Sequence, residues 1–179
     1  IDDTFLALSE KRFDELYEMY SDYKIPFWMN TRCETMTERR AQKLEEMNML
    51  RMNFGIEHGN PEYRRKVLKR PTSNERMINA FRMTSEKKYA VAGDLMIGMP
   101  DENRELVFDS INFTRQLPED VTRTGAFIFA PFHGTELRNI AVKKGYIKNP
   151  DSICDITKPE ENMLDQPQLP RQELIGLAG

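Results

Sequence analysis

The clearest structural signal in the sequence is the stretch YAVAGDLMIG at residues 89–98, which leads into the turn Met99-Pro100. Apolar residues dominate the stretch and a glycine closes it, as is typical of a buried strand. From Glu102 to Leu117 the apolar side chains then recur at helical spacing. A buried strand followed at once by an amphipathic helix is the repeating unit of parallel α/β folds.

The same alternation extends to both sides of this stretch. Further strands are predicted at residues 25–30, 52–57 and 124–132, and helices at residues 11–20, 38–50, 62–70, 75–83 and 136–144. The order favours a mainly parallel sheet with helices outside it, either as a whole or partial barrel or as a doubly wound sheet. The tail from Asn149 onward is rich in Pro, Asp and Gln and is predicted to be loop, with a short helix from Arg171.

Composition excludes several classes of protein. The 179 residues suit one domain, and 26 basic against 29 acidic residues leave no positive excess that would favour nucleic acid. No apolar run approaches the roughly 18–20 residues of a membrane span, and the first residues lack the features of a signal peptide. Two cysteines, Cys33 and Cys154, cannot form a disulfide scaffold or a cysteine-only metal site. We therefore expect a reduced, cytoplasmic protein with neither nucleic acid nor membrane as a partner.

Polar side chains gather where the predicted strands end. Chemistry in parallel βα folds is concentrated at the carboxyl ends of strands, because the loops there converge on one edge of the sheet. Asp2 and Asp3 would fit the end of a preceding strand. The other strand-end polar residues are Asn30, Arg32, Glu57, His58, Asp101, Glu102 and His133.

These residues also allow plainer readings. Arg32 and Glu57 are as readily a structural ion pair as part of a site. His58 and His133 have no second His or Cys at ligand spacing, so surface or hydrogen-bonded loop histidines are expected rather than metal ligands. The basic run at residues 64–70 is expected to be a solvated helix face. From the residues alone, the reaction type stays open.

Five motifs follow one another along the chain: Asp2-Asp3-x-Phe5, Trp28-x-Asn30-x-Arg32, Phe54-Gly55-Ile56-Glu57-x-Gly59, Met96-Ile97-Gly98-x-Pro100-x-Glu102 and Pro131-Phe132-x-Gly134-Thr135. In this order they resemble the radical S-adenosylmethionine (SAM) superfamily. The likeness is strongest to its cobalamin-binding group, which includes methyltransferases and an anaerobic magnesium-protoporphyrin ester cyclase. It covers residues 1–147, expected to form the radical SAM-like core from the end of the second strand onward, with residues 148–179 as a C-terminal extension.

The resemblance implies a partial (βα)6 barrel of the TIM type, truncated at its N-terminus. In that family a CxxxCxxC loop holds a [4Fe–4S] cluster, which cleaves SAM to methionine and a 5′-deoxyadenosyl radical. This sequence has no CxxxCxxC. We therefore expect the cluster ligands to lie outside this chain, with neither a catalytic residue nor a metal ligand within it, and the 179 residues alone to be inactive.

The full-length enzyme implied by the resemblance carries out radical chemistry or methyl transfer. Its cofactors would be SAM, the [4Fe–4S] cluster and, for this group, cobalamin. Its partners would be a small-molecule substrate and an electron donor such as flavodoxin or ferredoxin.

The resemblance also implies roles for individual residues in binding SAM. Glu57 would accept hydrogen bonds from the ribose hydroxyls. Arg32 and Asn30 would face the methionine end, and Asp2 and Asp3 the amino group. Met96, Ile97 and Gly98 would lie on the adenine side, although Asp94 and Asp101 replace the first glycine and the glutamate of the family's GxIxGxxE motif. Glu102 instead matches the glutamate of a PGET-like turn.

Two alternatives remain open at this point. The absence of CxxxCxxC allows a cluster-free barrel relic that acts as a non-catalytic binding module. A metal-independent βα-barrel enzyme is also possible, with Glu57 and either His58 or His133 as acid and base.

Overall fold

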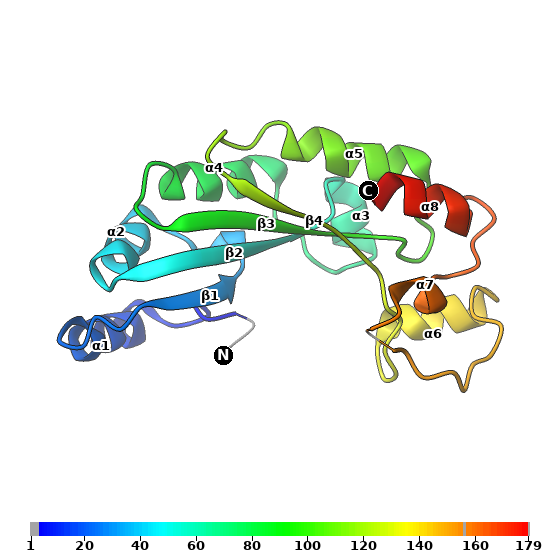
Figure 1. The fold of residues 1–179 in the computed structure, drawn as a ribbon, viewed down its shortest axis with the longest axis horizontal. Helices are drawn as coiled ribbons and strands as arrows, with labels where there is room; N and C mark the ends of the chain where they lie inside the picture. The colour runs from blue at the N-terminus through cyan, green and yellow to red at the C-terminus, as the bar shows by residue number, and fades with distance from the viewer. Residues whose placement is uncertain (1–3, 156, 179) are drawn as a thin grey trace. The chain divides into compact units, whose positions relative to one another are not determined.

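The chain folds as an α/β protein around a four-stranded parallel sheet, as predicted (Figure 1). The structure is a computed structural model that describes residues 4–155 and 157–178. The strands follow one another in the order β1-β2-β3-β4 across the sheet. In chain order the elements are α1 (Glu10–Ser21), β1 (Phe27–Thr31), the 3₁₀ helix η1 (Cys33–Thr35), α2 (Glu38–Glu46), β2 (Met49–Glu57), α3 (Pro61–Lys66), α4 (Asn74–Thr84), β3 (Ala90–Ile97), α5 (Arg104–Thr114), β4 (Thr122–Ile128), α6 (Glu136–Lys143), α7 (Pro159–Asn162) and α8 (Arg171–Ala178).

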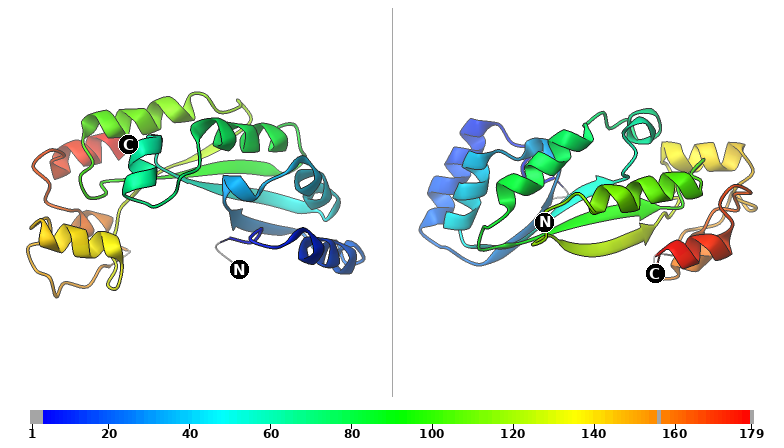
Figure 2. Two further views of the ribbon diagram at one scale, coloured as in Figure 1. Left: turned by 180° about the vertical axis from the view of Figure 1, so that it is seen from behind. Right: turned by 90° about the horizontal axis from the view of Figure 1, so that it is seen from above.

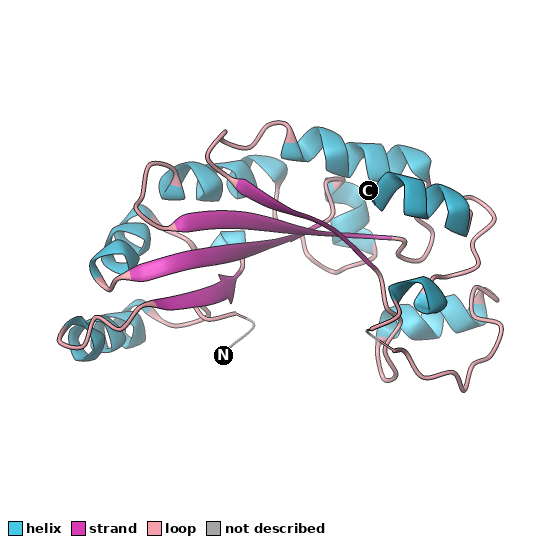
Figure 3. Cartoon of the chain, viewed as in Figure 1, coloured by secondary structure: helices cyan, strands magenta, loops and turns pink. Residues whose placement is uncertain are grey.

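Helix starts agree with the capping residues in the sequence. The side chains of Ser9, Thr37, Asn60, Ser73 and Thr135 each accept a hydrogen bond from a backbone N–H in the first turn of the helix that follows. Such caps satisfy amide groups that have no partner within the helix. The helices and strands therefore alternate as the sequence pattern predicts (Figure 3).

Several element ends differ from the prediction. The helix expected to reach Leu50 ends at Glu46, because Asn48 takes a positive φ of 68° and strand β2 begins at Met49. The helix expected to reach Arg70 ends at Lys66, before Lys69 with its φ of 55°. Residues with positive φ cannot continue a right-handed helix, and their side chains give little warning of it in the sequence.

The chain divides into two compact units. The first contains residues 1–56, 71–94 and 114–124, and the second contains residues 57–70, 95–113 and 125–179. Strands β2, β3 and β4 therefore contribute residues to both. In the part of the chain that the structure describes, no helix is long and apolar enough to cross a membrane.

In the first unit, helices α1, α2 and α4 lie on one side of the strands (Figure 2). The rings of Phe54 in β2 and Phe81 in α4 meet edge to face, with 4.9 Å between their centroids. A Cβ on Gly93 in β3 would lie 2.6 Å from Cδ1 of Ile56 and 3.1 Å from Cζ of Phe81. The absence of a side chain at Gly93 thus allows α4 to pack closely on the sheet.

Strand β1 pairs in parallel with β2. Its side chains show which residues lie on the face of the sheet away from these helices. Trp28 lies beside Arg51 and Asn30 beside Asn53. Met29, between Trp28 and Asn30, is buried, whereas Trp28 is 51% exposed. Because side chains alternate along a strand, Trp28 and Asn30 share the face of the sheet that the helices leave open.

The second unit buries two apolar clusters to which the C-terminal segment contributes. Leu164 packs with Tyr63, Met99, Phe129 and Ala141. In the other cluster, Met163, Leu169 and Leu174 pack with Ile97 and Val107. The helix predicted from Arg171 is confirmed as α8, and the segment that precedes it also holds α7. Residues after 147 therefore form part of a core.

Candidate functional site

Glu57 lies at the end of β2 in a conformation that non-glycine residues rarely adopt, with a φ of 63°. Its Oε1 accepts a hydrogen bond of 2.6 Å from Nη1 of Arg70. The Glu57 side chain is 30% exposed and that of Arg70 is 16% exposed. The ion pair considered with Arg32 is therefore replaced by one with Arg70. Within residues 4–155 and 157–178, Oε2 of Glu57 has no partner.

The basic run at residues 64–70 is not the solvated face that its composition suggested. Arg64 is only 1% exposed, and its Nη1 donates a hydrogen bond to the carbonyl oxygen of His58. The backbone N–H of Arg70 donates to the carbonyl oxygen of Arg64 at 2.9 Å. Arg65 and Lys66 are exposed and pair with Glu62. Two of these cations thus support the loop that follows β2.

His58 is completely buried and hydrogen-bonded through both ring nitrogens. Nδ1 accepts a hydrogen bond of 2.9 Å from the backbone N–H of Asn60. Nε2 must then carry the hydrogen, which it donates to Oε1 of Glu102 at 3.0 Å. The ring also stacks on Tyr63, with 4.4 Å between centroids. Of the two predicted settings, a surface or a hydrogen-bonded loop, the second is found for His58, whereas its complete burial and its partner 44 residues away were not foreseen.

Glu102 joins this histidine to the turn after β3. Its Oε2 accepts hydrogen bonds from the backbone N–H groups of Gly98 and of Met99, the latter at 3.1 Å. Tyr63 donates its phenolic hydrogen to the carbonyl oxygen of Pro100 at 2.6 Å. Burial, together with the negative charge of Glu102, raises the pKa of Tyr63, so the phenol remains a donor. The His58–Glu102 bond therefore connects the loop after β2 with the residues after β3, and the Tyr63 bond connects α3 with the same turn.

The buried side chain of Gln166 holds the same turn from the C-terminal segment. Its Nε2 donates to the carbonyl oxygens of Gly98, at 3.3 Å, and of Met99, at 2.9 Å. Its Oε1 accepts from the backbone N–H of Asp101 at 2.8 Å. Gly98 has a φ of 82°, and a Cβ there would lie 2.6 Å from Cδ2 of Leu174. The N–H and C=O of Gly98 are thus both used within the protein.

The predicted site residues of the first unit have polar groups that lack partners. Oδ1 of Asn30 is buried without a hydrogen bond. Arg32 is exposed, and no partner of its guanidinium is found in the described part of the chain. Beside Asn30, the side chain of Asn53 accepts from Nε of Arg51 at 2.9 Å and donates to Asp94 at 3.4 Å.

The remaining predicted residues lie in different surroundings. Met96 is half-buried against the cluster around Tyr63, and Ile97 is buried in the other cluster of the second unit. Asp2 and Asp3 lie outside the described residues. Asn30 and Arg32 belong to the first unit, whereas Glu57, Met96, Ile97 and Gly98 belong to the second.

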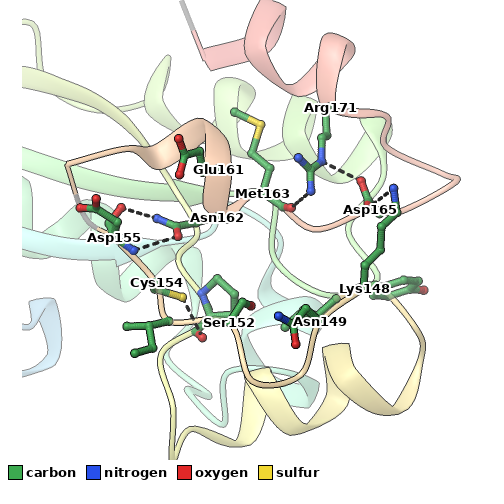
Figure 4. Close-up of a pocket in the computed structure, with 14 residues that line it drawn as sticks. Lys148, Asn149, Ser152, Cys154, Asp155, Glu161, Asn162, Met163, Asp165 and Arg171 are labelled. Carbon is green, nitrogen blue, oxygen red and sulfur yellow. Dashed lines mark hydrogen bonds and ion pairs between the residues drawn. The ribbon is translucent and has the colours of Figure 1, made fainter.

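Two cavities formed by described residues have none of these predicted residues in their walls. One, of about 350 Å³, lies in the second unit and includes Cys154, Asp155, Asn162, Asp165 and Arg171 in its wall (Figure 4). Its polar groups largely pair with one another, as in the ion pair of Arg171 with Asp165 at 2.7 Å. The other, of about 320 Å³, lies between η1 and α4 and includes Cys33 in its wall. Among the residues that the structure describes, no three His, Cys, Asp or Glu side chains are grouped as a metal site would need.

The family of the chain follows from its sequence. Residues 3–114 match the radical SAM superfamily, so the chain belongs to this superfamily, whose members are enzymes that use SAM and a [4Fe–4S] cluster. An "uncharacterized methyltransferase PH0819" from Pyrococcus horikoshii is 28% identical over 143 residues. That alignment covers 79% of this chain but only 30% of the relative.

Solved structures show the same fold. The radical SAM methyltransferase TsrM from Kitasatospora setae, solved with cobalamin and a [4Fe–4S] cluster, is similar with a TM-score of 0.63 at 18% identity, over 79% of this chain and 30% of TsrM. The coproporphyrinogen III oxidase HemN from Escherichia coli, a radical SAM enzyme, has a TM-score of 0.65 at 14% identity, over 97% of this chain and 36% of HemN. The predicted partial barrel of the radical SAM type is thereby confirmed, and the chain spans about a third of the length of these proteins.

Proposed function

We propose that this chain is the SAM-binding part of a cobalamin-dependent radical SAM methyltransferase. Membership of the superfamily and the likeness to two methyltransferases support this proposal. The observation that carries it is the Glu57 carboxylate at the end of β2. Arg70 holds one oxygen, and the other oxygen has no partner among the described residues. A fixed carboxylate with a spare acceptor suits the two adjacent hydroxyl donors of a ribose.

The first-unit residues suit the amino-acid end of SAM. An unpaired buried oxygen such as Oδ1 of Asn30 costs free energy unless a ligand supplies a donor, and an ammonium group would do so. The exposed guanidinium of Arg32 can pair with a carboxylate. The assignment of Asp2 and Asp3 to the same amino group belongs to this proposal, and both residues lie outside the described part of the chain.

The turn after β3 would contribute shape rather than hydrogen bonds to the adenine. Both backbone groups of Gly98 are already bonded to Glu102 and Gln166. Met96 is half-buried beside that turn, so its apolar side chain could contact the base, whereas Ile97 is buried and would support the turn from the core.

The cofactors would supply the reactive chemistry. The cluster, when bound, gives SAM the electron that cleaves it, and cobalamin carries the methyl group. This chain has only two cysteines, so we place the three cysteine ligands of the cluster in another part of the full-length protein. A small-molecule substrate, an electron donor such as flavodoxin or ferredoxin, and a cytoplasmic location belong to the same proposal.

The proposal is tested by binding of nucleosides to the chain. Titration of SAM and of 5′-methylthioadenosine, followed by ligand-observed NMR, should show both to bind. Glu57→Gln should weaken both by roughly 10-fold or more, because a hydrogen bond to a charged acceptor contributes about 1.5–3 kcal/mol. Glu62→Gln is the matched control, since Glu62 is exposed and its ion pairs in the described part of the chain are with Arg65 and Lys66. Equal affinities of wild type and Glu57→Gln would refute the assignment of Glu57.

A second candidate is the cluster-free binding module, which the presence of only two cysteines favours. The coding sequence upstream of Ile1 separates the two candidates. A CxxxCxxC in frame supports the radical SAM enzyme, and a start codon next to Ile1 without such cysteines supports the binding module.

A further inference from the structure

The loops that carry the two halves of the proposed nucleoside site are joined by one buried side-chain pair. Glu57 is the last residue of β2, directly before His58 in the loop, and Gly98 lies in the turn after β3. His58 and Glu102 connect them, and both side chains are completely buried. All of these residues belong to the second unit.

We propose that His58 and Glu102 are positioning residues that hold the Glu57 carboxylate at a set distance from the Gly98–Met99 turn, so that a nucleoside contacts both at once. The inference rests on the proposed function, because it takes Glu57 as the ribose acceptor and the turn as the adenine surface. Neither His58 nor Glu102 is assigned contact with the ligand.

The direction of each hydrogen bond supports this role. The Glu102 carboxylate accepts from Nε2 of His58 through one oxygen and from the N–H groups of Gly98 and Met99 through the other. A carboxylate is an acceptor only, so it satisfies three donors that no neutral side chain of its size can satisfy. Both the positions of the donors and the negative charge of Glu102 therefore favour this arrangement of the His58–Glu102 pair.

The other contacts of His58 reach the residues around Glu57. Its Nδ1 accepts from Asn60, its carbonyl oxygen accepts from Arg64, and its ring stacks on Tyr63. The backbone that follows Glu57, which itself has a φ of 63°, is thus fixed on several sides. Apolar side chains can often replace a buried polar pair without loss of stability. A polar pair at this place is accordingly explained better by the position it imposes than by the stability it adds.

Two substitutions of His58 distinguish the roles of its two ring nitrogens. His58→Gln keeps a hydrogen-bond donor near the place of Nε2, facing Glu102. His58→Asn keeps a polar atom near the place of Nδ1, facing Asn60, and loses the bond to Glu102. His133→Gln and His133→Asn are matched controls, because His133 is exposed and, among the described residues, bonds only to the carbonyl oxygen of Ser152.

Affinity for 5′-methylthioadenosine is the first measurement. We expect His58→Asn to bind this nucleoside about 10-fold more weakly than wild type, because one buried hydrogen bond that orders the site is lost. The affinity of His58→Gln should be closer to that of wild type. Both His133 variants should bind as wild type does. In the Glu57→Gln background, His58→Asn should have little further effect, because the group that it positions is already lost. Equal weakening in both backgrounds would show a merely structural role and overturn the inference.

Hydrogen exchange of the wild-type chain is the second measurement and needs no variant. Addition of the nucleoside should slow exchange at residues 57–60 and at residues 98–102 together. Slowing confined to one of these loops would overturn the inference even if His58→Asn failed to fold. If the wild type bound neither SAM nor 5′-methylthioadenosine, the proposed function itself would be rejected. Normal wild-type binding with an unaffected His58→Asn would reject the positioning role alone.

Discussion

Gly59 shows how one residue allows the loop after β2 to pack on α5. A Cβ at this position would overlap the backbone of Asp109 and Ser110, and the N–H of Gly59 donates to Oγ of Ser110 at 2.9 Å. The overlap is with main chain, which cannot move aside as a flexible side chain can. The close approach therefore explains the glycine that follows His58.

Gly59→Ala should consequently lower the stability of the chain by about 1–3 kcal/mol, the usual range for overpacking. Thermal denaturation followed by circular dichroism measures the effect. Gly176→Ala is the control, since Gly176 lies within α8 with open space around it and alanine should stabilise that helix by about 0.5–1 kcal/mol. An unchanged melting temperature of Gly59→Ala would contradict the packing described for this loop.

At the scale of single residues, the sequence predicted which residues belong to the candidate site better than it predicted their hydrogen-bond partners. Glu57 was found from its strand-end position and its family motif, but its bond to Arg70 depends on where the intervening chain turns back. His58 and Glu102 were each identified as strand-end residues, yet 44 residues separate them. The local sequence around either residue does not indicate that the two are in contact. Hydrogen bonds between loops depend on tertiary structure, which local periodicity does not contain.

At the scale of elements, α1 and α2 are held together by charges. Hydrogen bonds from Lys43 and then from Arg39 lower the pKa of Asp14 below 3.8. The folded chain therefore holds this proton less tightly than the unfolded chain does. The stabilisation is fully present above pH 3.8 and is lost as the pH falls through the lowered pKa.

Asp14→Asn should then melt below the wild type at pH 7, and the difference should shrink as the pH falls below 3.8. Melting temperatures measured between pH 7 and pH 2.5 test this expectation. Glu18→Gln, on the same helix but exposed, is a control in which little change is expected. A difference that grows on acidification would show that the charges do not connect the helices.

The C-terminal segment is joined to the turn after β3 by Gln166. Gln166→Ala removes two donated hydrogen bonds and two accepted ones, three of which hold the turn at residues 98–101, so this turn should exchange its amide hydrogens faster. We expect a loss of about 1–3 kcal/mol in stability, because buried groups are left without partners. Gln172→Ala, at an exposed position of α8, should leave exchange at the turn unchanged. Faster exchange at the turn in Gln172→Ala but not in Gln166→Ala would show that Gln166 does not hold this turn.

Helices and strands were largely predictable because apolar periodicity and capping residues are local. Their ends were less so, since left-handed residues such as Asn48 and Lys69 end elements without Gly or Pro. The prediction of a tail that is mostly loop missed α7 and the burial of apolar side chains in the residues that follow it. Those side chains are scattered among Pro, Asp and Gln, so no periodic pattern predicts their burial.

At the scale of the whole molecule, cluster chemistry lies beyond what these residues can hold alone. Cysteine thiolates hold [4Fe–4S] clusters, and Cys33 and Cys154 belong to different units. Anaerobic reconstitution with iron and sulfide should therefore give the 179-residue chain no stoichiometric cluster, as judged by visible absorption. The same treatment of a longer protein that supplies CxxxCxxC is the positive control. A cluster in the short chain that disappears in Cys33→Ser or Cys154→Ser would contradict this expectation.

Trp28 is the one tryptophan of the chain, and half of its surface is exposed on the face of the sheet that the helices leave open. Its neighbour in register is Arg51, and Asn30, with its unpaired oxygen, is two residues along the same strand. Indole fluorescence responds to polarity and to nearby charge. The emission of the unlabelled chain therefore originates at a single place beside these polar groups, so a shift in its wavelength or intensity would report a molecule that arrives on that face.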